Sequence, residues 1–365
     1  MRRLESSRVR GLSLRASLLA AAGLVCLAGG AGATAAPRAV PLSRLAGQLV
    51  MSPLAGTRPG ASLLARIRAG QLGGVILFGP NIRSLERLRE LTAQLQLAAA
   101  AGGNPPLLVA VDQEGGPVRR LRFAPPALSA QAMGRAGSAS AVRTAGAATG
   151  RALRAAGVNL DLAPVADVPS SPRSFLGSRA FGRDPALVAS LAAAFVDGVQ
   201  SMGVAATAKH FPGLGTAAAS TDLHRVVIRT PRAELLARLA PFRAAITAGV
   251  DLVMVSNAAY QALDGSGLPA VLSASIVDGL LRDTLGFHGV VITDTLSAPG
   301  PAAYAEAAVR TIEAGGDIVL YATSETEAAR GYASLLAAAG SGRLSRARLE
   351  ESYARIAALK RRLAG

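Results

Sequence analysis

The sequence predicts an α/β protein built as a single (β/α)8 barrel of the triosephosphate isomerase (TIM) type, with no second C-terminal domain. Short apolar runs rich in β-branched residues recur along the chain, each preceded by Gly, Pro or Asp. Longer Ala- and Leu-rich segments with helical character separate them, and this alternation implies parallel strands with crossover helices. No Pro- or Ser-rich linker divides the part of the chain that contains these segments, which indicates one domain. A doubly wound open sheet gives the same local signals and is the alternative.

The predicted elements follow one another in a regular order. Eight strands are predicted at residues 47–51, 74–78, 107–111, 158–163, 205–210, 251–256, 290–293 and 318–321. Helical segments between them are predicted at 84–101, 186–202, 232–248, 275–285 and 302–314, and a final helix at 345–363 closes the chain. Eight such units are what a (β/α)8 barrel requires.

The N-terminal segment is typical of a secretory signal peptide, which we predict for residues 1–35, with the barrel domain at 36–365. Arginines precede an apolar run at residues 16–27, and Ala33-Thr34-Ala35 provides a small-residue cleavage site. The chain's single cysteine, Cys26, lies in that run, so lipid anchoring there is a less favoured alternative to release. We therefore expect an exported, extracytoplasmic protein.

The charge of +16 first suggests a nucleic-acid partner, but the pattern argues against one. Arginines are spread along the chain, aromatic residues make up 4%, and no nucleic-acid-binding motif is present. A diffuse basic surface suits a protein that works near anionic polymers of the cell envelope. A biased genome composition explains the arginines equally well.

Polar residues follow five of the eight predicted strands. Since active sites of such barrels lie at the C-terminal ends of the strands, these residues are expected to meet at one face. They are Asp112, Asp161 with Asp167, Lys209 with His210, Asn257, and Asp294.

Asp294 and Asp112 are candidate functional carboxylates. Asp294 ends a buried apolar run and would be held rigidly, as a nucleophile must be. Asp112 is followed by Gln113-Glu114-Gly115-Gly116, whose glycines permit close approach of a ligand, so Asp112 is a candidate clamp for that ligand. A helix N-cap for Asp294 and a turn role for Asp112 are the structural alternatives.

The segment from Lys209 to His224 holds two of the three histidines and one of the two lysines. Lys209 and His210 are adjacent, so both can face a ligand only if the strand ends there; a buried structural histidine is the alternative for His210. A loop rich in small residues follows and carries Asp222 and His224, which are a candidate acid/base pair because a carboxylate can orient an imidazole. A zinc site is disfavoured, because the mature chain would lack cysteine and His288 precedes a strand.

In these motifs the chain resembles glycoside hydrolase family 3, and within it the single-domain β-N-acetylglucosaminidases that trim peptidoglycan fragments. The resemblance runs from about residue 42 to 330 and rests on the segments at residues 74–82, 112–120, 163–167, 179–185, 209–213 and 286–294. It implies a (β/α)8 barrel that acts on a small carbohydrate, with no metal or organic cofactor. We expect the protein to be a monomer.

The resemblance also implies residue roles. Asp294 would be the nucleophile that forms a covalent glycosyl-enzyme, and Asp222 with His224 would be the acid/base dyad. Substrate binding would fall to Asp112, Arg179, Lys209 and His210.

Five positions depart from the family pattern: Leu214, Leu223, Asn257, Thr295 and Ala298. They remove no proposed catalytic group but alter the expected wall of the pocket. A β-glucosidase and a non-catalytic sugar-binding protein of the envelope therefore remain alternatives. A phosphorolytic enzyme also remains open, because a neutral histidine in the dyad repels an incoming phosphate less than a carboxylate would.

Overall fold

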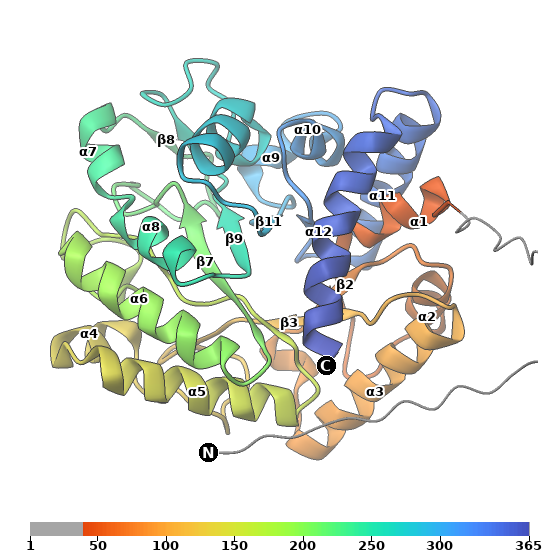
Figure 1. The fold of residues 1–365 in the computed structure, drawn as a ribbon, viewed down its shortest axis with the longest axis horizontal. Helices are drawn as coiled ribbons and strands as arrows, with labels where there is room; N and C mark the ends of the chain where they lie inside the picture. Colours follow the sequence, from red (N-terminus) through yellow and green to blue (C-terminus); the bar gives the residue numbers. More distant parts are fainter. Residues whose placement is uncertain (1–38, 365) are drawn as a thin grey trace, which may run out of the picture. The chain divides into compact units, whose positions relative to one another are not determined.

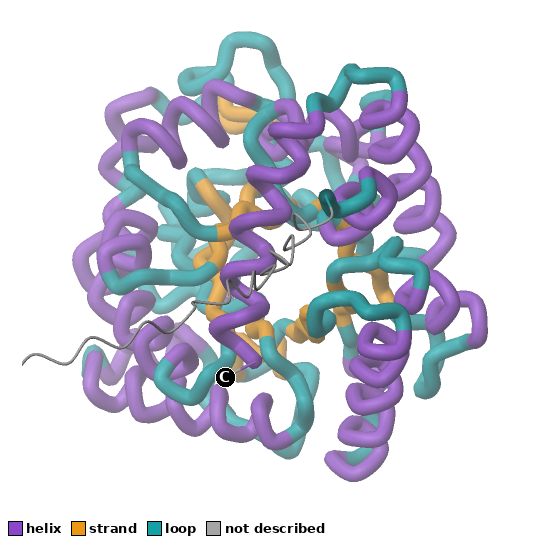
Figure 2. The backbone as a smooth tube through the Cα atoms, turned by 45° about the vertical axis from the view of Figure 1, so that its right-hand side comes forward, coloured by secondary structure: helices purple, strands orange, loops and turns teal. Residues whose placement is uncertain are grey.

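The computed structural model describes residues 39–364. Eight parallel strands form one sheet in the order β11-β9-β7-β6-β3-β2-β1-β12. Figure 1 labels five of them, β2, β3, β7, β9 and β11, and Figure 2 shows the strands in orange inside a layer of helices. A parallel bridge between Ile292 and Ile318 joins the two ends of this order, so the sheet closes into the predicted barrel. The strands are β1 (Val50–Pro53), β2 (Gly74–Ile76), β3 (Leu108–Val111), β6 (Leu160–Asp161), β7 (Ala205–Phe211), β9 (Leu252–Val255), β11 (Val290–Thr293) and β12 (Val319–Leu320).

Helices surround the barrel, as Figure 2 shows. They are α1 (Leu42–Gln48), α2 (Ala61–Arg68), α3 (Leu85–Ala101), α4 (Ala130–Ala136), α5 (Ala139–Ala155), α6 (Pro185–Gln200), α7 (Arg232–Ala237), α8 (Ala240–Thr247), α9 (Pro299–Ala302), α10 (Ala307–Glu313), α11 (Glu325–Gly340) and α12 (Arg346–Ala364). A π-helical segment, η4 (Ser275–Thr284), lies between β9 and β11. No helix within residues 39–364 is long and apolar enough to span a membrane.

All eight predicted strands are confirmed, with small differences at their ends. The first was predicted too early, because Gly47 and Gln48 end α1. The helix predicted at 232–248 is two helices, and Pro241, which lacks an amide N–H, lies in the first turn of the second. The helix predicted at 302–314 is interrupted at Glu306, whose φ of 55° is incompatible with a right-handed helix. Helices α2, α4, α5 and α11 lie in segments for which the sequence pattern predicts no specific element.

The predicted signal peptide and Cys26 lie outside the described residues. The barrel domain, predicted to begin at residue 36, is described from residue 39 onward.

Buried polar groups fasten the C-terminal helix α12 to the barrel. The carboxylate of Asp317, just before β12, is fully buried and accepts hydrogen bonds from Arg282 Nη2 at 2.6 Å and Ser352 Oγ at 2.7 Å. It also accepts bonds from Arg355 and from the backbone N–H of Val291, so it joins η4, β11 and α12.

A second buried polar contact joins α12 to α1. Lys360 Nζ donates to Gln48 Oε1 at 2.7 Å, and the lysine side chain is only 2% exposed. Burial lowers the pKa of Lys360 to about 7, because no carboxylate compensates for the lost water.

Two short pairings extend the C-terminal face of the barrel. After β3, the chain forms an antiparallel hairpin of β4 (Gln113–Gly115) and β5 (Val118–Arg119). The turn needs glycine, since Gly115 and Gly116 have φ of 103° and 55°. Strands β8 (Val227–Ile228) and β10 (Ala259–Tyr260) pair in parallel after β7 and β9.

Candidate functional site

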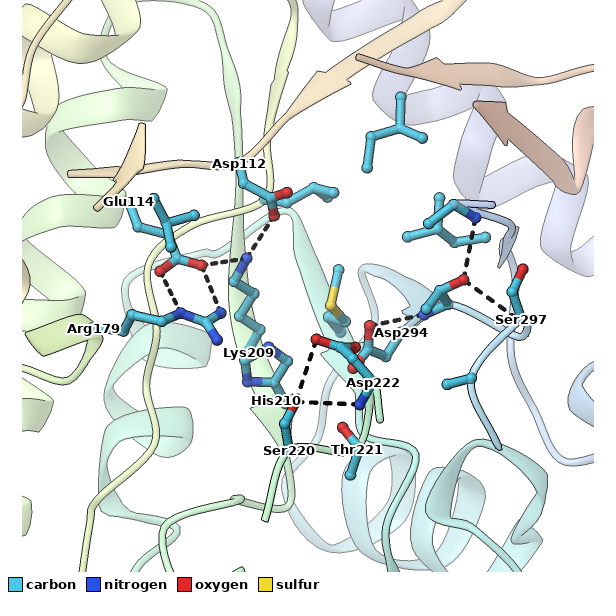
Figure 3. Close-up of a pocket in the computed structure, with 18 of the residues that line it drawn as sticks. Asp112, Glu114, Arg179, Lys209, His210, Ser220, Thr221, Asp222, Asp294 and Ser297 are labelled. Atoms are coloured by element: carbon cyan, nitrogen blue, oxygen red, sulfur yellow. Dashed lines mark hydrogen bonds and ion pairs between the residues drawn. The ribbon is translucent and has the colours of Figure 1, made fainter. Parts of the chain in front are cut away.

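A cavity of about 500 Å³ lies at the C-terminal ends of the strands (Figure 3). This volume is suitable for a small ligand. Six of the seven residues predicted to act on the substrate line it: Asp112, Arg179, Lys209, His210, Asp222 and Asp294. The C-terminal face is therefore the functional face, as the strand-end pattern indicated.

One wall of the cavity is a network of charged side chains centred on Lys209. Its Nζ lies 2.8 Å from Asp112 Oδ1 and 2.8 Å from Glu114 Oε1. Arg179 binds both oxygens of Glu114, each at 2.8 Å, in a bidentate pair. Arg120 Nη2 donates to Asp112 Oδ2 at 3.1 Å. Two carboxylates are thus held among three cations, which fixes them at the ligand-facing wall.

The network keeps its carboxylates ionised although they are buried. Burial alone would raise the pKa of Glu114, but the charges of Lys209 and Arg179 outweigh it and lower the pKa. The pKa of Asp112 is lowered in the same way, by Lys209 and Arg120 against the effect of burial. Burial also acts to lower the pKa of Lys209, but Asp112 and Glu114 raise it. The wall therefore presents fixed charges to a ligand.

A neutral carboxyl group lies behind this wall. Asp161 is fully buried, and its Oδ1 accepts the backbone N–H of Gln113 at 3.0 Å, while Oδ2 has no hydrogen-bond partner among the described residues. Burial raises its pKa to about 8. Asp161 does not line the cavity, and its hydrogen bond with Gln113 supports the start of the β4–β5 hairpin.

His210 is held by a buried carboxylate. Its Nδ1 lies 2.7 Å from Asp167 Oδ2, and because an ionised carboxylate can only accept, Nδ1 donates this bond. The Nε2 atom is then the ring nitrogen that remains for a ligand. Asp167 Oδ1 also accepts the N–H of Leu214 at 2.7 Å, so one carboxylate orients the imidazole and the loop that follows β7.

Lys209 and His210 both line the cavity although they are neighbours in the sequence. The pairing of β7 with β9 is irregular between Lys209 and Phe211, so the alternation of side chains is broken there. We expected both side chains to face a ligand only if the strand ended at these residues. Strand β7 instead continues to Phe211, and the irregular pairing within it lets both side chains face the cavity.

Asp294 stands at the end of β11 on the opposite side of the cavity from Glu114 (Figure 3). Its backbone N–H donates to Val255 O, and its Oδ1 accepts the N–H of Thr295 at 2.7 Å. Burial, and then the charge of Asp222, raise the pKa of Asp294. The alternative that Asp294 caps the next helix is wrong, because the N-cap of α9 is Ala298.

The loop after β7 brings Ser220, Thr221 and Asp222 into the cavity wall. Asp222 Oδ2 accepts a hydrogen bond from Ser220 Oγ at 3.4 Å. His224 is exposed and does not line the cavity, and no hydrogen bond joins it to Asp222 in this structure of residues 39–364. The two members of the predicted dyad are therefore close in sequence but not paired in this conformation.

The five positions that depart from the family pattern differ in their placement. Leu214, Thr295 and Ala298 line the cavity. Asn257 does not: its Nδ2 donates to Thr295 O at 2.8 Å, so it supports the segment after Asp294. Leu223 is 72% exposed.

Glu114 and Arg120 are site residues that the strand-end reasoning missed. Both belong to the hairpin after β3 rather than to a barrel strand, so the rule that pointed to Asp112 does not reach them. The signal that could have found them is the glycine pair at 115–116, which folds the chain back over the site. Among the described residues, no group of three or more His, Cys, Asp or Glu is arranged to hold a metal ion.

A (β/α)8 barrel with a charged, polar pocket at its C-terminal face is the architecture of an enzyme that binds a small polar substrate. Comparison with known proteins identifies the class. Residues 42–359 match the model of the glycosyl hydrolase family 3 N terminal domain.

Named relatives agree with this match. An uncharacterized secreted glycosyl hydrolase of Arthroderma benhamiae is 36% identical over 344 residues, covering 91% of this chain and 97% of the relative. A beta-hexosaminidase of Thioalkalivibrio sulfidiphilus is 36% identical over 291 residues, covering 77% and 82%. The solved structure of a family 3 beta-N-acetylglucosaminidase from Paenibacillus sp. str. FPU-7 superimposes with a TM-score of 0.87 at 38% identity; the match covers 89% of this chain and 63% of the Paenibacillus chain.

The chain belongs to glycoside hydrolase family 3, and the resemblance drawn from its motifs is confirmed. It is a glycoside hydrolase, and its similarity within the family is to the β-hexosaminidases and β-N-acetylglucosaminidases.

Proposed function

We propose that this enzyme is a retaining β-N-acetylhexosaminidase that removes terminal non-reducing N-acetylglucosamine, with peptidoglycan fragments as its substrate, through a covalent intermediate on Asp294. The observation that carries the proposal is the position of Asp294, on a rigid strand end across the cavity from the Lys209 network. The β-hexosaminidase and β-N-acetylglucosaminidase relatives support the activity.

In this proposal the terminal sugar lies between the network and Asp294. Each carboxylate oxygen has two lone pairs, so Asp112 can accept from sugar hydroxyls while it remains bound to Lys209 and Arg120. Arg179 and Lys209 are donors for the remaining hydroxyls and the acetamido carbonyl, and Nε2 of His210 can accept a hydrogen bond from a sugar hydroxyl. Because the wall is already organised, the sugar is bound without a large cost of ordering side chains.

The first step transfers the sugar to Asp294. A carboxylate oxygen of Asp294 attacks C1, and the bond between C1 and the glycosidic oxygen breaks with its electron pair passing to that oxygen. The imidazolium of His224 donates the proton that the leaving oxygen takes up, and Asp222 stabilises the charged ring beforehand. Since His224 faces solvent in this structure, this step requires the loop after β7 to carry it over the cavity.

The second step releases the sugar. A water molecule attacks C1 from the opposite face while His224 takes its proton, and the bond to Asp294 breaks, which restores both groups. Two inversions at C1 leave the configuration unchanged. Phosphate in place of water would yield a sugar 1-phosphate instead, so product analysis in phosphate buffer separates hydrolysis from phosphorolysis.

The test of this function is hydrolysis of aryl β-glycosides with and without a 2-acetamido group. The unmodified enzyme is expected to cleave the acetamido substrate selectively, and Asp294→Ala to abolish cleavage. His224→Ala is expected to lose most rate on substrates with poor leaving groups, which need the proton in the first step. On an aryl substrate with a good leaving group, release of the sugar from Asp294 limits the rate of this variant, and azide should restore turnover with formation of the β-glycosyl azide. An unmodified enzyme that cleaves neither substrate would contradict the proposal, as would equal cleavage by Asp294→Ala.

We also infer that the enzyme is exported and acts as a monomer. The basic and apolar N-terminal segment and the description of the Arthroderma relative as secreted support export. N-terminal sequencing of material recovered outside the cytoplasm, and sedimentation of that material, test the two points.

A further inference from the structure

The carboxylate of the proposed nucleophile is held by a single hydrogen bond from the protein. Asp294 Oδ1 accepts the backbone N–H of Thr295 at 2.7 Å, and the carboxylate makes no other hydrogen bond or ion pair within residues 39–364 (Figure 3). A nucleophile must be aligned with the carbon that it attacks, because small errors of position lower the rate strongly. The orientation of Asp294 therefore depends on the backbone of Thr295.

Thr295 is itself held from the two strands that flank β11. Asn257, which follows β9, donates from Nδ2 to Thr295 O at 2.8 Å. On the other side Ala322, which follows β12, donates its N–H to Thr295 Oγ1 at 3.1 Å. Because the carbonyl and the side chain of Thr295 are both fixed, its N–H is kept in the direction of Asp294.

The hydrogen bonding of Asn257 is unusual for a buried asparagine. Its side chain is only 1% exposed, and its Oδ1 is buried without a hydrogen-bond partner among the described residues. An unpaired buried acceptor costs free energy, so this residue is a poor choice for stability alone. Asn159, before β6, instead pairs both ends of its amide, with the N–H of Val109 and with Leu107 O. The contrast indicates that Asn257 serves the site through its bond to Thr295.

We propose that Asn257 is a positioning residue for the nucleophile: by holding Thr295, it orients the carboxylate of Asp294 toward C1 of the bound sugar. This inference rests on the proposed function and adds to it a residue that contacts neither the substrate nor Asp294. Asn257 does not line the cavity, so its effect on the reaction passes through the backbone of Thr295.

Loss of this positioning changes the pH dependence of the reaction in a definite direction. Burial raises the pKa of Asp294, and the N–H of Thr295 acts against burial because it stabilises the ionised carboxylate. The titratable groups that also act on Asp294 are Lys209 and His210 of β7 and Asp222 of the following loop. When Thr295 is released, its bond to Asp294 weakens and the pKa of Asp294 rises further. The acidic limb of the kcat/KM profile then moves to higher pH, since the nucleophile must be ionised.

Asn257→Leu tests the proposal, because leucine has a similar volume and cannot donate to Thr295 O. With an aryl N-acetyl-β-glucosaminide, kcat/KM reports formation of the glycosyl-enzyme and is expected to fall on the order of tenfold. The acidic limb is expected to move to higher pH. The inhibition constant of free N-acetylglucosamine should not change, because the wall around Lys209 is untouched. Asn159→Leu, at the opposite end of the barrel, is the matched control and should lower stability without moving the acidic limb.

An acidic limb of Asn257→Leu that coincides with that of the unmodified enzyme would overturn the inference, as would an equal displacement in Asn159→Leu. If Asn257→Leu does not fold, Asn257→Ala removes the same donor with a smaller side chain and gives the same comparison. Failure of the proposed function is a different result, in which the unmodified enzyme shows no cleavage that depends on Asp294.

Discussion

The ammonium nitrogen of Lys209 lies 2.8 Å from the carboxylate of Glu114, and each side chain is only 2% exposed. Such a buried pair is costly to desolvate, and its partners become unpaired charges when one member is removed. Here Arg179 and Asp112 complete the network, so the pair contributes to the fold as well as to the ligand-facing wall.

Replacing Glu114 by Gln is expected to destabilise the protein by about 3 kcal/mol, because Lys209 and Arg179 lose their shared carboxylate. Chemical denaturation at pH 7 measures this. Glu90→Gln, which removes an exposed pair with Arg87, is the control and should change stability far less, because water and salt screen exposed charges.

The pH dependence of that difference has a definite sign. Since the pKa of Glu114 is lowered from the ordinary value of 4.5, its stabilisation is present above that value and is lost as pH falls through the lower folded pKa. The stability of the two proteins should therefore converge in acid. A constant difference would show that charge is not the cause.

Asp222→Asn is expected to move the acidic limb of the pH–rate profile to lower pH. The nucleophile must be ionised, so rate falls as pH decreases through the raised pKa of Asp294. Burial is the first cause of that shift and Asp222 contributes to it, so loss of the Asp222 charge lowers the pKa of Asp294. Profiles of kcat/KM for both proteins, with the exposed Asp283→Asn as control, test this; an unmoved limb, or one at higher pH, would contradict it.

Lys360→Met is expected to stabilise the protein most at low pH. The folded pKa of Lys360, about 7, lies below its ordinary value of 10.5, so the unfolded chain binds more protons between these values. The unmodified protein should thus gain stability over the variant by about 1.4 kcal/mol per pH unit in this window. Chemical denaturation of both proteins at pH 7 and pH 9 measures this gain. If their free energies of unfolding changed equally between the two pH values, Lys360 would not be neutral in the folded protein.

Asp317→Asn is expected to destabilise the protein by about 3–5 kcal/mol, because Arg282 and Arg355 lose a buried carboxylate. Asp317 lies before β12, at the end of the barrel opposite the cavity, so kcat/KM of the folded variant should change little. Glu313→Gln, at an exposed pair with Arg343, is the control for stability. If Asp317→Asn and Glu313→Gln lowered the free energy of unfolding by similar amounts, the role assigned to Asp317 would be contradicted.

The barrel could be predicted because buried parallel strands leave a strong mark in sequence. Runs such as 290–292 are apolar throughout, and the segments that contain them are bounded by Gly or Asp, here Gly289 and Asp294. Interruptions of helices are harder to predict from the sequence. Pro241 indicates one of them, but the positive φ of Glu306 depends on the packing of its neighbours.

The site was predictable to the extent that its residues end barrel strands. Asp112, Lys209 and Asp294 satisfy that condition and line the cavity. Glu114 does not, because its position depends on the hairpin that follows β3. The orientation of His224 is a property of a loop conformation, which no periodic pattern encodes.

The most direct test of the account is to identify the residue that becomes covalently glycosylated. The enzyme would be treated with a 5-fluoro N-acetylglucosaminyl fluoride, which forms the intermediate faster than it hydrolyses, and then digested and analysed by mass spectrometry. The account predicts one added glycosyl residue, on the peptide that contains Asp294, and no addition to Asp294→Ala. A modified residue other than Asp294, or no adduct while the reagent is turned over, would contradict it.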